Sequence, residues 1–251
     1  MIHPADLPKA ASLVRSKIPK GLSDVESLFL TGGSIELMLS GKGLNVKAHT
    51  HNQELFTFWA CLSWDALRVA KIAKELRPFF RDEETFYQFQ ETRNESLDPF
   101  VRSAIFFALN RSSKSGLVSS GKYDEGCPRF TDLSISNIAQ FKFNNLIVNK
   151  VENYVDAVTN DIDRFLICCP YEKFTERKLT MAPLAMEMRR IQHMKLRSNL
   201  FNRENWILIY ELNSDVIDAY SGYNYELYGA GFNPVNNFDR AKYILIFANN
   251  L

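Results

Sequence analysis

The sequence predicts an α/β fold, and two observations carry that prediction. Five short apolar runs have the length of buried strands, and stretches of helical length and periodicity lie between them. Strands that alternate with such helices form crossover units, which favours a mostly parallel sheet covered on both faces. The 251 residues, 46% of them hydrophobic, suffice for one large domain or for one domain that carries an insertion.

The elements follow from these runs in chain order. The expected strands are residues 25–30, 44–49, 164–169, 205–212 and 242–248. The expected helices are residues 11–18, 53–76, 149–161 and 186–198. The alternation breaks between residues 76 and 143, where a polar and aromatic stretch precedes a Ser/Gly/Lys-rich one. We therefore expect an α/β core made of residues 1–75 and 144–251, and an inserted, mainly helical subdomain at residues 76–143.

Charge and cysteine content restrict the function classes. Thirty Lys and Arg residues against 29 Asp and Glu give a net charge of +1, so nucleic-acid binding would depend on a local basic face. The four cysteines include an adjacent pair, which argues against a disulfide framework and predicts reduced thiols. No segment has the length of an apolar membrane span, and we expect a soluble, cytoplasmic protein with no membrane partner.

The segment "LNRSSKSGL" at residues 109–117 resembles part of the Dam-like DNA adenine methyltransferases, which read roughly L-N-R-T-x-F-N-G-L there. Leu109, Asn110, Arg111, Gly116 and Leu117 match that pattern. The family's aromatic residue and asparagine before the glycine are replaced by Lys114 and Ser115. The match is partial, but further motifs of the family follow in the same order along the chain.

Four of these motifs concern the cofactor and the reaction. Lys9 in "ADLPK" stands at the lysine of W-x-G-G-K, and "FLTGG" stands at the cofactor loop F-x-G-x-G, with Phe29 and Gly33 kept and Thr31 in place of the first glycine. Thr50 aligns with the acidic residue that binds the cofactor's ribose. The catalytic motif D-P-P-Y falls on Cys168, Cys169, Pro170 and Tyr171. The resemblance implies a Rossmann-like methyltransferase sheet, a target-recognition-like insertion, and S-adenosylmethionine as the cofactor.

The replaced residues alter the cofactor site. Thr31 has a branched Cβ that resists the positive φ common in such loops, although Gly32 and Gly33 could shift the turn by one residue. The alternative is a plain strand-to-helix turn with Ser34 as the helix N-cap. The Thr50 hydroxyl cannot accept the two hydrogen bonds that a carboxylate accepts from a ribose diol. Glu54, one turn further on, is a candidate substitute carboxylate or else a solvated residue at a helix start.

The catalytic tetrapeptide is altered as well. The resemblance implies that the aspartate accepts a hydrogen bond from the amino group of a flipped adenine and that the tyrosine stacks on the base. Tyr171 keeps the stacking ring, but the Cys168 thiol is a poor acceptor at neutral pH. These departures favour a degenerate, catalytically inactive homologue, a pseudoenzyme of phage or bacterial origin. An active enzyme with an atypical C-C-P-Y motif is the alternative.

Double-stranded DNA or a protein is the expected partner of an inactive homologue. The candidate DNA-binding residues of the insertion are Asn110, Arg111, Lys114, Lys122 and Arg129, and a later helix carries Arg189, Arg190, Lys195 and Arg197 opposite an apolar face of Leu184, Met188 and Ile191. Asn110 and Arg111 are alternatively internal braces. A structural or virion-associated role would use the aromatic residues of the insertion: Phe79, Phe80, Phe86, Tyr87 and Phe89.

Two further interpretations of the cysteines remain open at this point. His49 and His51 could join Cys168 and Cys169 in a zinc site, although adjacent residues of a strand point to opposite faces, and we expect no metal. Cys168 could also act as a nucleophile with one of these histidines as its base. A buried cysteine beside an apolar strand is usually inert, which argues against this role.

Overall fold

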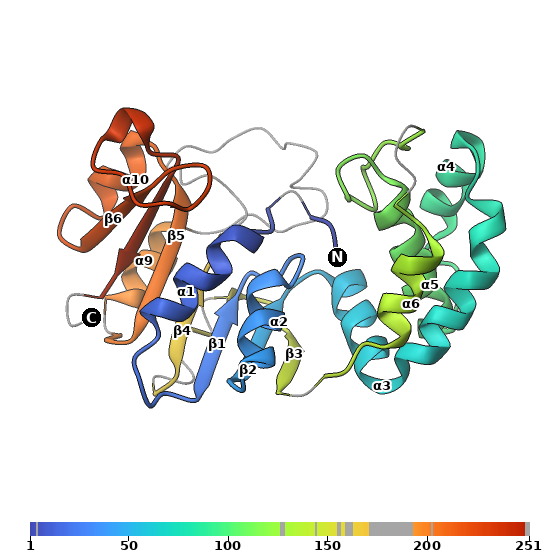
Figure 1. Cartoon of the computed structure of the whole chain (residues 1–251), viewed down its shortest axis with the longest axis horizontal. Helices are drawn as coiled ribbons and strands as arrows, with labels where there is room; N and C mark the ends of the chain where they lie inside the picture. Colours follow the sequence, from blue (N-terminus) through green and yellow to red (C-terminus); the bar gives the residue numbers. More distant parts are fainter. Residues whose placement is uncertain are drawn as a thin grey trace. The chain divides into compact units, whose positions relative to one another are not determined.

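The computed structural model describes residues 1–3, 5–125, 129–143, 145–154, 157–158, 163–170, 193–201 and 203–248 (Figure 1). The chain divides into two compact units. One is mainly helical and centres on Asn52–Phe143 together with Met1–Asp6. The other contains the sheet and includes Leu7–His51 and the strands that follow residue 144.

One mixed sheet organises the α/β unit. Its strands are β1 (Asp24–Leu28), β2 (Asn45–Thr50), β3 (Leu146–Lys150), β4 (Phe165–Cys168), β5 (Trp206–Glu211), β6 (Asn224–Tyr228) and β7 (Tyr243–Phe247). The order is β3-β2-β1-β4-β5-β7-β6, in which β7 runs antiparallel to both of its neighbours and all other pairs are parallel. This confirms the α/β class and the mostly parallel sheet, and it is compatible with a Rossmann-like methyltransferase fold.

Helices pack on both faces of this sheet (Figure 1). The α/β unit contains η1 (Pro8–Ala10), α1 (Ala11–Lys17), α2 (Ser34–Gly41), α9 (His193–Leu200), α10 (Ser214–Ala219) and η3 (Phe238–Arg240). On one face, Lys17 of α1 lies over the Phe247 ring, and the Ser27 hydroxyl of β1 donates to Glu36 of α2 at 2.6 Å. On the other face, His193 of α9 bonds the Tyr210 hydroxyl of β5 at 2.7 Å.

That second face also buries a charged cluster. Glu26 in the middle of β1 is fully buried, and its carboxylate lies 2.7 Å from His49 Nε2, 3.6 Å from Lys47 Nζ and 3.9 Å from Arg203 Nη2. Arg203 also donates to two backbone carbonyls, at 2.9 and 2.6 Å. A buried carboxylate needs such partners, because an unpaired charge there would cost several kcal/mol, roughly 3–5 when one partner is removed.

The helical unit is built by α3 (Gln53–Leu76), η2 (Arg77–Phe79), α4 (Glu83–Thr92), α5 (Pro99–Ser112) and α6 (Asp132–Ala139). Its helices start where the sequence offers N-caps: Asn52, Asp82, Asp98 and Thr131 each accept a hydrogen bond from a first-turn amide. A core of phenylalanines joins α3 to α5, with the Phe58 ring stacked 6.2 Å from that of Phe107.

The α3 helix bends inside this unit. Asp65 has φ −151° and ψ 83°, and its side chain accepts from the Arg68 amide at 2.9 Å. Asp65 therefore caps the second half of the helix at the kink. The sequence assigns residues 53–75 to the α/β core, whereas α3 packs against α5 and α6 of the helical unit. The expected start of the inserted target-recognition-like subdomain at residue 76 stays a prediction.

The N-terminal residues give this unit an acid-sensitive element. His3 is half-buried, its Nδ1 accepts from the Ala5 amide at 3.2 Å, and burial lowers its pKa to about 4. The folded pKa lies below the unfolded value of 6.5, so the unfolded state binds more protons between these two pH values. The stability contributed by His3 is therefore fully present above pH 6.5 and falls on acidification, by up to about 1.4 kcal/mol per pH unit.

Urea unfolding from pH 4 to 7 should show a shallower pH dependence of the unfolding free energy for His3→Gln than for the wild type. Equal slopes of unfolding free energy against pH would contradict this.

Candidate functional site

The carboxyl ends of β1 and β2 form the edge where open α/β sheets commonly bind ligands. The chain leaves β1 through Phe29, whose φ of 64° is left-handed, and enters α2 through Gly33, whose φ is 83°. The Leu30 amide donates to the His49 carbonyl at 2.8 Å, which holds the loop against β2. A bulky residue at positive φ stores backbone strain, which often accompanies functional sites.

Thr31 sits in this turn without the expected strain. It is 7% exposed, and among the described non-glycine residues a positive φ occurs only at Phe29 and Phe232. The left-handed positions are Phe29 and Gly33, so the turn is shifted onto a glycine, as Gly32 and Gly33 allowed, and Thr31 keeps a negative φ. The alternative of Ser34 as N-cap is wrong: Ser34 is the first helical residue, and Gly33 occupies the cap position without a side-chain hydrogen bond.

Tyr154, shortly after β3, packs onto both strand ends. Its ring centroid lies 4.1 Å from that of Phe29 and 5.4 Å from that of His51. Its hydroxyl is 3.3 Å from the His51 amide nitrogen and 2.9 Å from His51 Nδ1. Burial raises the pKa of Tyr154, while hydrogen bonds to the His51 backbone and the Thr50 side chain oppose that shift. Sequence reasoning missed Tyr154 because it also missed β3, and an aromatic residue just past a strand end was the available signal.

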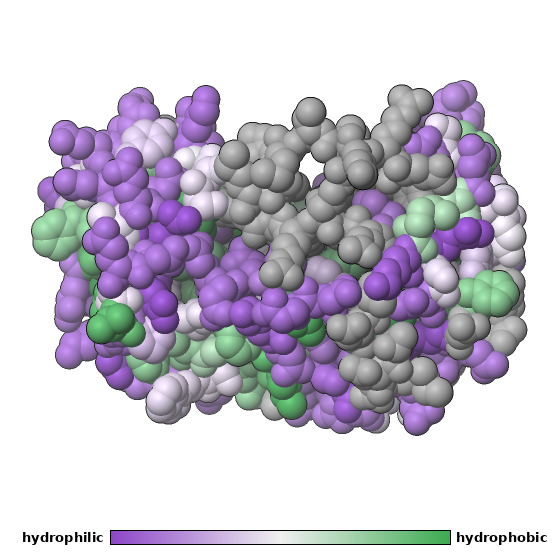
Figure 2. Space-filling view, turned by 180° about the vertical axis from the view of Figure 1, so that it is seen from behind, coloured by the Kyte–Doolittle hydropathy of each residue, from purple (hydrophilic) through white to green (hydrophobic). Residues whose placement is uncertain are grey.

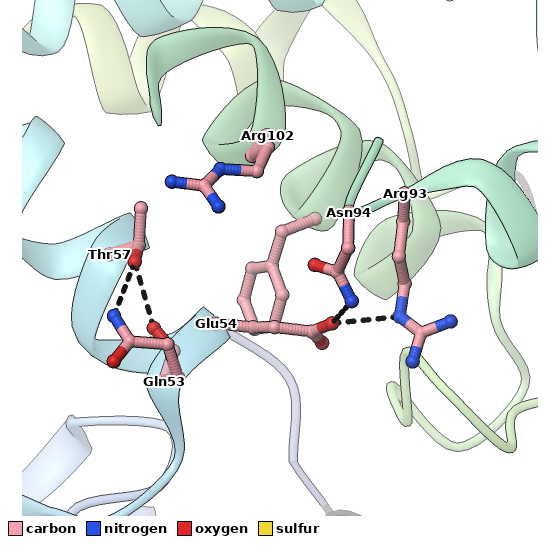
Figure 3. Close-up of a pocket in the computed structure, with 7 residues that line it drawn as sticks. Gln53, Glu54, Thr57, Arg93, Asn94 and Arg102 are labelled. Atoms are coloured by element: carbon pink, nitrogen blue, oxygen red, sulfur yellow. Dashed lines mark hydrogen bonds and ion pairs between the residues drawn. The ribbon is translucent and has the colours of Figure 1, made fainter. Parts of the chain in front are cut away.

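The polar residues expected around the cofactor differ in solvent exposure and in their hydrogen-bond partners. Thr50, the last residue of β2, is 1% exposed, whereas Lys9 in η1 is exposed. Glu54 is 23% exposed and already paired: its Oε1 accepts from Arg93 Nε and from Asn94 Nδ2, both at 2.8 Å (Figure 3). A ribose diol would have to compete with that ion pair.

Cys168, which the resemblance matches to the family's catalytic aspartate, ends β4 and is fully buried. Burial raises the pKa of its thiol, the nearby Glu26 carboxylate adds to the rise, and Arg203 opposes it. Cys169 and Pro170 are half-buried, and Tyr171 lies outside the described residues. A shielded, neutral thiol reaches neither a base nor a substrate carbonyl, which argues against both the acceptor and the nucleophile interpretations of Cys168.

The histidines named for a zinc site have other partners. His49 binds Glu26, and His51 binds Tyr154. Across the described residues, no group of three or more His, Cys, Asp or Glu side chains is arranged to hold a metal ion. The described helices also include none that is long and apolar enough to cross a membrane.

Two of the candidate DNA-binding residues, Asn110 and Arg129, are internal braces. Asn110 is 1% exposed; it donates to the Ile2 and Gly116 carbonyls, each at 2.6 Å, and accepts from the Ile2 amide at 3.2 Å. Arg129 donates to the carbonyls of Ser113 and Lys114 and lies 3.5 Å from an Asp124 oxygen. These contacts tie the loop after α5 to its surroundings.

Arg111, Lys114 and Lys122 differ from these two. The Arg111 guanidinium lies 5.8 Å from the Phe107 ring centroid, and burial lowers its pKa, helped by the neighbouring Arg129 charge. Lys114 and Lys122 are exposed, and the Lys114 amide donates to the Lys122 carbonyl at 2.8 Å. This backbone bond places the two lysines opposite each other on one loop.

The residues suggested on the later helix and for a partner surface are only partly described. Arg189, Arg190, Leu184, Met188 and Ile191 lie outside the described residues, whereas Lys195 and Arg197 lie in α9, with Arg197 6.0 Å from the Tyr220 ring centroid.

Most of the suggested aromatic surface is packed. Phe80 and Phe86 are buried, Phe80 stacks on Phe89 at 4.8 Å, and Phe86 contacts Tyr87, while Phe79 is 60% exposed. On the face shown in Figure 2, hydrophobic side chains form small groups among hydrophilic ones.

Comparison with known proteins gives one kind of relative. The chain is 27% identical over 171 residues to the DNA adenine methylase of Escherichia coli strain K12, and the protein of the same description from E. coli O157:H7 matches equally. The match covers 63% of this chain and 59% of the relative, so it spans about three fifths of the methylase's length. No family model matches the chain. The chain is thus similar to DNA adenine methylase in sequence, and its sheet is compatible with such a fold.

Proposed function

We propose that this chain is a methyltransferase-like protein that has lost methyl transfer and retains double-stranded DNA binding through its helical unit. The observation that carries the proposal is the burial of Cys168 at the catalytic position. A carboxylate that polarises an adenine amino group must reach the substrate, and loss of one such oriented interaction commonly costs orders of magnitude in rate. A fully buried thiol supplies no such group.

The edge of the sheet supports the same proposal. Thr50 offers a hydroxyl where a carboxylate would bind the ribose, and Tyr154 packs against Phe29 and His51 at that edge. S-adenosylmethionine would have to displace the ring of Tyr154 or bind beside it, without the charge-assisted hydrogen bonds of a carboxylate. We infer that the cofactor binds weakly or not at all, while the helical insertion keeps its target-recognition role.

One observation favours a second candidate, an active DNA adenine methyltransferase with a C-C-P-Y motif. The loop from Phe29 to Gly33 retains a left-handed glycine at the start of α2, and Thr31 fits it without strain. A backbone able to approach a nucleotide is therefore still present. This candidate differs from the first in requiring S-adenosylmethionine.

Titration calorimetry with S-adenosylmethionine separates the two candidates. We expect no heat of binding at millimolar cofactor, because the ribose carboxylate is replaced and the strand ends are packed. Binding in the micromolar range, or transfer of a labelled methyl group to unmethylated DNA, would overturn the degenerate assignment and support the active enzyme.

DNA binding is tested by gel shift across salt concentrations. The double variant Lys114→Ala/Lys122→Ala should bind duplex DNA more weakly, and the slope of log K against log salt should fall by about 2 if both lysines contact phosphates. Lys20→Ala/Lys42→Ala removes two exposed lysines of the other unit and is the matched control. Unchanged affinity and slope in the first variant would exclude these lysines, and absence of any shift in the wild type would exclude DNA as partner.

A further inference from the structure

A small pocket in the helical unit lies between the start of α3 and the start of α5 (Figure 3). It is lined by Gln53, Glu54, Thr57, Arg93, Asn94, Arg102 and Phe106, and its cavity volume is about 30 Å³. A water molecule needs roughly 10–15 Å³ of such space. The pocket therefore admits two or three water-sized groups of a ligand and is too small for a whole nucleobase.

The acidic side chains around the pocket already have partners. Glu54 Oε1 accepts from Arg93 and Asn94, as described above. Asp98, the N-cap of α5, accepts from the Phe100 amide at 2.8 Å through one oxygen and from Arg68 Nη2 at 2.7 Å through the other. Neither carboxylate neutralises a further cation.

Arg102 is the cation that these acids leave uncompensated. It lies in the first turn of α5, where the helix dipole disfavours positive charge. Its Nε is shielded from solvent without a hydrogen-bond partner, and its guanidinium makes no hydrogen bond or ion pair to the described residues. Figure 3 shows this guanidinium apart from the bonded Glu54–Arg93–Asn94 group and from the bonded Gln53–Thr57 pair. Buried donors are usually hydrogen-bonded, so this Nε, together with its place in a pocket wall, is open to an acceptor from outside the chain.

The charge balance indicates the ligand. Arg93 and Arg102 against Glu54 leave a charge of +1 around the pocket, which one singly charged phosphodiester neutralises. The planar fork of an arginine binds two phosphate oxygens at once, and a cavity for two or three water-sized groups accommodates such oxygens. We propose that Arg102 binds a phosphate group, supplied by the backbone of a nucleic acid. The nucleic-acid source rests on the DNA binding proposed above, and free phosphate is the alternative source.

Arg102→Gln tests this inference against DNA. We expect its Kd for duplex DNA at 0.15 M salt to rise about tenfold, because a charge-assisted contact is lost. The loss should be equal for unrelated sequences, and the salt slope should fall by about 0.9, as for one phosphate contact. Lys71→Gln, which removes an exposed charge from α3 of the same unit, is the matched control and should change neither quantity as much.

A second arm separates the two phosphate sources. Thermal unfolding in sodium phosphate and in sodium chloride of equal ionic strength should show a phosphate-specific gain in Tm for the wild type that Arg102→Gln loses. If the wild type binds no DNA but shows this gain, the site stands with free phosphate and the proposed DNA function fails. If Arg102→Gln matches the wild type in Tm gain and in any DNA binding, the inference is overturned. Arg102→Lys, which keeps the charge, replaces the glutamine variant if that variant does not fold, and it should raise Kd a few-fold without changing the slope.

Discussion

Replacing Cys168 with aspartate is expected to destabilise the α/β unit by about 3–5 kcal/mol and to restore no methyl transfer. The new carboxylate would be fully buried beside Glu26, a like charge. Arg203 is the nearby cation, and it already binds two carbonyls and faces Glu26. Urea unfolding gives the stability change, and transfer of a labelled methyl group from S-adenosylmethionine to unmethylated DNA gives the activity.

Two variants control this experiment. Cys168→Ala removes the sulfur without adding charge and should cost far less than the aspartate. Cys168→Asp/Cys169→Pro rebuilds the family's D-P-P-Y motif up to Tyr171. We expect it to be as inactive as the single variant, because Thr50 remains where the resemblance implies a ribose-binding carboxylate. Measurable methyl transfer by the double variant would show that the catalytic motif alone had been lost.

Replacing Asn110 with leucine is expected to cost about 2–4 kcal/mol of unfolding free energy. Leucine has nearly the same volume, but it makes none of the three hydrogen bonds of the amide. The Ile2 amide, the Ile2 carbonyl and the Gly116 carbonyl would lose a partner together. Gly116 has φ 79°, and a Cβ there would meet the Ile2 oxygen at 2.5 Å, so the two backbone segments that Asn110 joins lie close together.

Lys114→Ala is the control for this prediction, since Lys114 is exposed on the loop after α5. Its unfolding free energy should change by less than about 0.5 kcal/mol. The pair also separates bracing from DNA contact: Asn110→Leu should lower stability, and Lys114→Ala should lower DNA affinity. If Asn110→Leu were as stable as the wild type but bound DNA more weakly, Asn110 would be a DNA-contact residue and not an internal brace.

The interior strands of the sheet could be predicted from the sequence, and the edge strands could not. β1, β2, β4, β5 and β7 match the five apolar runs because strands buried on both faces read as continuous hydrophobic segments. β3 and β6 are the two outer strands, and each has exposed positions, such as Ile147 at 65% and Tyr225 at 40%. Half-exposed strands lack the apolar run that marks the others.

The candidate site was harder to predict, because the role of each residue depends on where its side chain points. The sequence places Thr31, Thr50 and Cys168 at strand ends but does not say that Cys168 points into the buried cluster around Glu26. Tyr154 reaches Phe29 only through the pairing of β3 with β2, which joins residues about a hundred positions apart. The starts of the helices could be predicted from the sequence, because a cap depends only on nearby residues: Asn52 and Asp98 accept hydrogen bonds from amides within three positions.

The strand order also determines when the sheet can form as the chain is synthesised. Val25 of β1 pairs with Phe165 of β4, and the antiparallel β7 lies between β5 and β6, although β6 precedes it in sequence. The helices between β2 and β3 pack on one another, α3 against α5 and α6, so this unit can fold before the rest of the sheet is made. Meanwhile β1 and β2 each keep an unpaired edge, because β3 begins only at Leu146 and β4 only at Phe165. Refolding should therefore show an early helical phase and a slow one in which the sheet closes.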